Sequence, residues 1–180
     1  MVKKFEVLTG QTRTTRSGKK LTRVSPKELI ALGVTDPLAF GEAWRDDSGM
    51  VWGDMVRENG LPRFMFIKDA TAYCKHLGAQ LPSAWPESRN SGHGNKDSDF
   101  VRLAKFLSDT LFSERMLPNF VYIEDGKAYA RRFWSATPVD PRFGTDYYGY
   151  VFRGEAGYSI DALTDGFDGG IATRCVVAPR

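Results

Sequence analysis

The sequence predicts a single α+β domain built from two main helices and a mixed, mostly antiparallel set of short strands. Hydrophobic residues make up 42% of the 180 residues and aromatic residues 13%, which is enough to form a core. Eighteen glycines and nine prolines divide the chain into short elements. Two helix-like stretches lie in the middle of the chain, and strand-like stretches flank them on both sides. This order of elements favours an α+β fold over a helical bundle.

The first main helix is predicted over residues 67–78. Ala70, Cys74 and Leu77 recur there at the i, i+4, i+7 spacing of one helix face, and Gly78 is a stop signal.

The second main helix is predicted over residues 98–111. An apolar stripe runs along it from Phe100 to Leu111, and Asp97 or Ser98 can serve as its N-cap.

Turn signals predict three hairpins. The stretch "DDSG" at 46–49 lies between strands that carry Trp44 and Trp52. Asn59-Gly60 and Asp125-Gly126 are the dipeptides that favour tight hairpin turns.

Aromatic residues on the predicted strands are expected to form the core rather than to contact a ligand. This set consists of Trp44, Trp52, Phe133 and Trp134. The alternating residues Tyr148, Tyr150 and Phe152 share one strand face and are expected to pack inward as well.

Residues 1–41 are predicted to be a basic N-terminal arm that acts as a linker, a stalk or an oligomerisation segment. Residues 1–40 carry eight Lys or Arg and three acidic residues. The arm holds one short helix, "PKELIAL" at 26–32, in which Ser25 and Glu28 form a capping box. A solvated arm is the simpler interpretation, and a polyanion-binding arm is the alternative. Since no nucleic-acid-binding motif accompanies the charge, the sequence disfavours nucleic acid as a partner.

The sequence gives no sign of a membrane span or a signal peptide. No apolar stretch reaches the roughly 18–20 residues that cross a bilayer, and the N-terminus lacks the apolar run of a signal peptide. A cytoplasmic protein and a fragment of an exported one both remain open.

Catalytic and metal-binding patterns are not evident, and we expect a non-enzymatic protein with no cofactor and no metal. His76 and His93 are the two histidines, and their context suggests neither zinc nor a catalytic triad. Asp97 and Asp99 are better explained by helix capping than by calcium, which takes six to eight oxygen ligands.

Residues 140–169 are the predicted binding segment. They combine tyrosines, acids, glycines and an arginine, a composition suited to surface recognition. The predicted ligand-binding residues are Tyr147, Arg153, Tyr158, Asp161 and Asp165.

Several motifs, in order, resemble bacterial C-type-lectin-like domains, in a branch often found at the tips of adhesins and fibres. The motifs are "AWRDDSGMVWGD" at 43–54, "DATAYCKHLGAQLPS" at 69–83, "LPNF" at 117–120, "FWSAT" at 133–137 and "IATRCVV" at 171–177. The resemblance covers about residues 42–177, so it implies a C-type-lectin-like domain over 42–180. Formylglycine-generating enzymes and retroelement-diversified variable proteins are similar at a greater distance.

The resemblance implies that the first main helix packs beside the last strand, that residues 170–177 pair with an early strand, and that Cys74 and Cys175 form a disulfide. The alternative is two free buried cysteines in a cytoplasmic protein. A disulfide would indicate an extracellular, cell-surface or periplasmic location. The redox cysteine pair of formylglycine-generating enzymes and the calcium-binding motifs of sugar-binding C-type lectins are both missing, so we expect calcium-independent binding.

The sequence therefore predicts an adhesin-like recognition module for a cell-surface glycan or protein, with a homo-oligomer (a trimer) formed through the N-terminal segment. Two alternatives remain. One is a retroelement-diversified ligand-binding protein, and the other is an accessory protein that binds nucleic acid or another polyanion through the basic arm.

Overall fold

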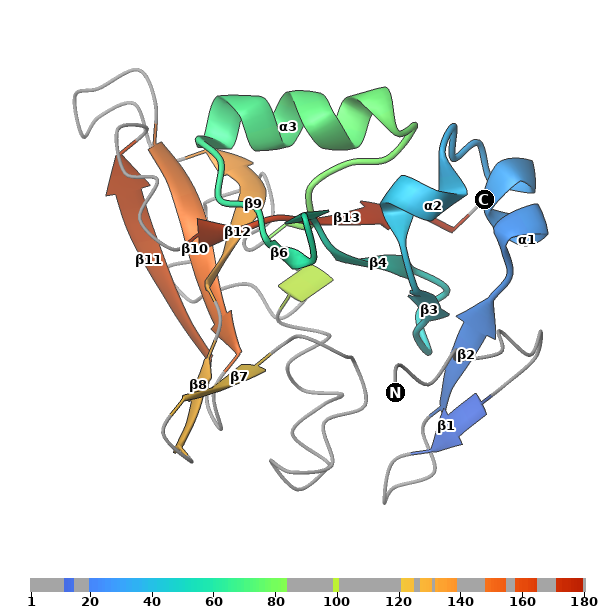
Figure 1. Cartoon of the computed structure of the whole chain (residues 1–180), viewed down its shortest axis with the longest axis horizontal. Helices are drawn as coiled ribbons and strands as arrows, with labels where there is room; N and C mark the ends of the chain where they lie inside the picture. The colour runs from blue at the N-terminus through green and yellow to red at the C-terminus, as the bar shows by residue number, and fades with distance from the viewer. Residues whose placement is uncertain are drawn as a thin grey trace, which may run out of the picture.

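The computed structural model describes residues 12–14, 20–83, 99–100, 121–124, 127–130, 132–138, 148–154, 158–164 and 171–179 (Figure 1). The strands between residues 121 and 164, apart from 133–136, are described by their backbone pairing. Helices and mostly antiparallel sheets are both present, which confirms the predicted α+β class.

A five-stranded antiparallel sheet joins the beginning of the chain to its end. Its order is β1-β2-β3-β4-β13. The strands are β1 (Thr12–Thr14), β2 (Lys20–Val24), β3 (Ala43–Arg45), β4 (Val51–Met55) and β13 (Arg174–Val177). Because β13 pairs with β4, the last strand lies beside an early one, as expected.

A four-stranded sheet forms the other side of the molecule in Figure 1, in the order β11-β10-β9-β12. Its strands are β9 (Arg132–Pro138), β10 (Tyr148–Gly154), β11 (Tyr158–Thr164) and β12 (Ile171–Ala172). The β9–β12 pair is parallel, and the other pairs are antiparallel.

Two small hairpins form at predicted places; residues 125 and 126, between the strands of the second, lie outside the described residues. In the first, β5 (Arg57–Glu58) pairs with β6 (Leu61–Pro62), and Asn59 and Gly60 have φ angles of 52° and 78°. Two consecutive left-handed residues are what a type I′ turn requires. In the second, β7 (Val121–Glu124) pairs with β8 (Lys127–Ala130).

The β3–β4 hairpin also forms at the predicted place, with Trp44 opposite Trp52. The Asp46 carboxylate holds the turn, because it accepts bonds from the backbone N–H groups of Ser48 and Met50. Its other oxygen accepts the Trp52 indole N–H at 2.9 Å. One buried acid therefore fixes both the turn and the orientation of a core tryptophan.

Three helices lie within residues 20–83: α1 (Pro26–Ala31), α2 (Pro37–Phe40) and α3 (Ile67–His76). The Ser25 hydroxyl caps α1 by accepting the Glu28 N–H, as predicted. Helix α2 follows, and it begins at Pro37 because the Asp36 side chain accepts the Ala39 N–H.

The predicted 67–78 helix is confirmed as α3, with Ala70, Cys74 and Leu77 buried. Of the second predicted helix, residues 99 and 100 are helical, and the remainder lies outside the described residues. Asp99 accepts the Ser83 N–H at 2.9 Å and donates its own N–H to the Ser83 hydroxyl.

All four aromatic residues expected in the core are fully buried: Trp44, Trp52, Phe133 and Trp134 each expose 0% of their surface. Each removes a large apolar area from water, as expected for core residues.

The segment before residue 42 contributes to this core. Val24, Leu29 and Phe40 pack in the same cluster as Trp134 and Cys175, and β2 pairs with β3. The boundary at residue 41 stays a prediction, but the described residues from 20 onward pair with and pack against later segments of the chain.

The C-terminal end of α3 is held by the loop between α1 and α2. Thr35 donates its N–H to the Leu77 carbonyl and its hydroxyl to the His76 carbonyl. Gly78 follows with a φ of 71°, and a Cβ there would meet the Gly33 carbonyl oxygen. Only glycine satisfies both the backbone conformation and the close approach.

We expect Gly78→Ala to destabilise the protein more than Gly60→Ala, the matched control. Both positions have a left-handed φ, which costs a non-glycine residue about 1–2 kcal/mol. A Cβ at Gly60 meets nothing within 4 Å, whereas at Gly78 the backbone must move. The free energy of unfolding in urea should differ between the variants by at least about 1 kcal/mol. Equal losses would show that α3 and the Gly33 loop are not in close contact.

Candidate functional site

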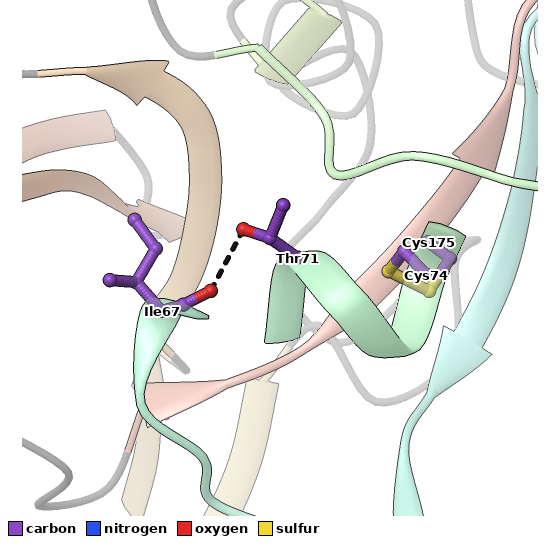
Figure 2. The surroundings of a disulfide bond; sticks show 4 residues. All are labelled: Ile67, Thr71, Cys74 and Cys175. Atoms are coloured by element: carbon purple, nitrogen blue, oxygen red, sulfur yellow. Dashed lines mark hydrogen bonds between the residues drawn. A yellow bond between two sulfur atoms is a disulfide. The ribbon is translucent and has the colours of Figure 1, made fainter. Parts of the chain in front are cut away.

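A disulfide joins Cys74 of α3 to Cys175 of β13, the pairing implied by the resemblance (Figure 2). The Cα atoms are 5.4 Å apart, and 101 positions separate the two residues in sequence. Both cysteines are buried. Within the same helix, the Thr71 hydroxyl donates to the Ile67 carbonyl at 2.8 Å. The bridge fixes α3 against the five-stranded sheet.

Trp134 attaches the four-stranded sheet to the start of α3. Its indole N–H donates to the Met65 carbonyl at 2.7 Å, and its ring belongs to the core cluster that contains Cys74 and Cys175. The sheet that carries the predicted site is thereby packed against the disulfide-bonded helix.

The opposite face of β9 packs against the five-stranded sheet. The Phe133 ring lies 6.3 Å from that of Phe100, which lies 5.5 Å from that of Trp52. The buried Arg174 guanidinium sits 5.5 Å from the Phe133 ring centre and donates to the Gly53 carbonyl at 2.6 Å. Both faces of β9 are therefore packed at the level of Phe133 and Trp134.

Three of the five predicted site residues lie on the β10–β11 hairpin. Arg153 is on β10, and Tyr158 and Asp161 are on β11. Tyr147 and Asp165 lie outside the described residues. The hairpin is at the edge of the four-stranded sheet, beside β9.

The strand register separates these three residues into two groups. Arg153 pairs with Ser159 and Asp161 pairs with Val151, so Arg153 and Asp161 occupy diagonal positions on one face. Tyr158 pairs with Gly154, which alternation assigns to the other face. The structure brings Arg153 and Asp161 together and does not bring Tyr158 to them.

The same register resolves which aromatic positions share which face. Phe152 pairs with Phe133, and alternation adds Tyr148 and Tyr150 to that face. Val151 pairs with Trp134, so Arg153 and Asp161 belong to the face of Trp134.

Sequence reasoning missed one residue of this region, Arg132. It is the first residue of β9 and lies directly opposite Arg153. The signal was present in "RRFWSAT", where Arg132 is two positions from Trp134 and so shares its face. Only the pairing of β9 with β10 reveals that the two arginines are neighbours.

Two further expectations concern metals and membranes. His76 is exposed on α3, and His93 lies outside the described residues. In the described ranges, no three His, Cys, Asp or Glu side chains are grouped so that they could hold a metal ion. No helix in that part of the chain is long and apolar enough to cross a membrane.

Comparisons of the chain with protein-family models, with curated proteins and with solved structures find no match.

Proposed function

We propose that the protein is a non-enzymatic recognition module with a C-type-lectin-like fold, which binds a cell-surface glycan or protein without calcium. The binding surface is formed by the β10–β11 hairpin and the segments that flank it, with Tyr147, Arg153, Tyr158, Asp161 and Asp165 as the candidate contacts.

The observation that carries this proposal is the connection of α3 to the last strand. The motifs around Cys74 and Cys175 suggest that the helix and the terminal strand lie together, and the bridge has the geometry of a disulfide. The pairing of β13 with β4 supports the same layout, in which the chain closes on itself. The β10–β11 hairpin then lies in a separate sheet, supported by β9.

The disulfide also supports a location outside the cytoplasm. Disulfides persist in oxidising compartments and are rare where thiols are kept reduced. An extracellular, cell-surface or periplasmic site is therefore part of the proposal.

A single domain of this kind is expected to bind weakly. Individual contacts at a recognition surface contribute about 1–2 kcal/mol, and several linked copies raise the overall affinity. A homo-oligomer, such as a trimer formed through the N-terminal segment, would supply those copies.

We expect the triple replacement of Tyr147, Arg153 and Tyr158 by alanine to abolish binding on a glycan array and on cells. The melting temperature should stay within a few degrees of the parent value, because these residues are proposed as contacts rather than core. Arg63→Ala, an exposed arginine on another segment, is the matched control.

Two other variants make the result specific. Arg153→Ala and Tyr158→Ala, made singly, show which face of the hairpin binds, since the register places them on opposite faces. Removal of residues 1–19 leaves β2 intact and tests the basic arm. Binding that survives the triple replacement, or that disappears only with residues 1–19, would move the function to the arm and favour a polyanion partner.

A further inference from the structure

We draw no further inference here: the strongest candidate, the surface patch of exposed apolar side chains on strand β6 and the segment that leads into α3 (Leu61, Phe64 and Phe66), carries none, because nothing in the structure shows what covers it.

Discussion

Replacing Cys74 and Cys175 together by alanine is expected to lower the free energy of unfolding by about 4–5 kcal/mol. The bridge closes a loop of 101 residues, and a closure of that length restricts the unfolded chain by about this amount. Domains are typically stable by about 5–15 kcal/mol, so the variant should be close to unfolding at body temperature. Urea unfolding of the oxidised parent and the variant measures the difference.

Two controls accompany this measurement. Reduction of the parent protein in urea should reproduce the loss, because it removes the same covalent link. Thr71→Ala removes a hydroxyl on the exposed surface of the same helix and should cost much less. A double variant that loses less than about 1 kcal/mol would contradict the role given to the bridge.

Trp134→Ala is expected to cost about 3–5 kcal/mol, the usual range for removing a fully buried large aromatic side chain. The variant also leaves the Met65 carbonyl without its indole partner, which adds to the loss. For a chain of this length, the melting temperature should fall by about 6–20 °C. Differential scanning calorimetry gives the value.

Trp134→Phe separates the two contributions, because it keeps an aromatic ring and removes the N–H donor. Its melting temperature should lie between those of the parent and Trp134→Ala. If Trp134→Ala instead left the melting temperature unchanged and removed glycan binding, Trp134 would be a ligand contact and the packing of β9 on α3 would be wrongly assigned.

Local sequence signals are sufficient for the elements whose cause is local. The Asn59-Gly60 turn, the capped helix α1 and the amphipathic helix α3 each depend on residues within one or two turns of chain. The aromatic core can be predicted from strand positions alone, as the complete burial of Trp44 and Trp134 illustrates.

The features that sequence reasoning missed depend on contacts between distant segments. The segment 33–35 caps the C-terminal end of α3, some forty residues away in the sequence. No local sequence pattern predicts a contact between these two segments. Helix α2 has only four residues, too few for a periodic pattern, so its sequence resembles a connector. Strand β2 lies in a basic stretch with the composition of a solvated arm, although Leu21 and Val24 are buried.

The candidate site shows the same limit. Arg153, Tyr158 and Asp161 form a group in the sequence because they are close along the chain, but the strand register decides which of them share a face. A shift of one residue would reverse the assignment of Tyr158 relative to Arg153. Arg132 lies opposite Arg153 only because β9 pairs with β10. Composition indicates a recognition surface, and pairing indicates which residues can act together.

The central claim is that the protein recognises a ligand through the β10–β11 hairpin. Hydrogen exchange measured by mass spectrometry tests this claim most directly. The exchange is compared with and without the strongest glycan or protein ligand found on arrays and cells. We expect slower exchange in peptides that cover 132–138 and 148–164, with no change in α3. Slower exchange confined to residues 1–19, or to the segment 57–66 with its exposed Leu61, Phe64 and Phe66, would contradict the claim.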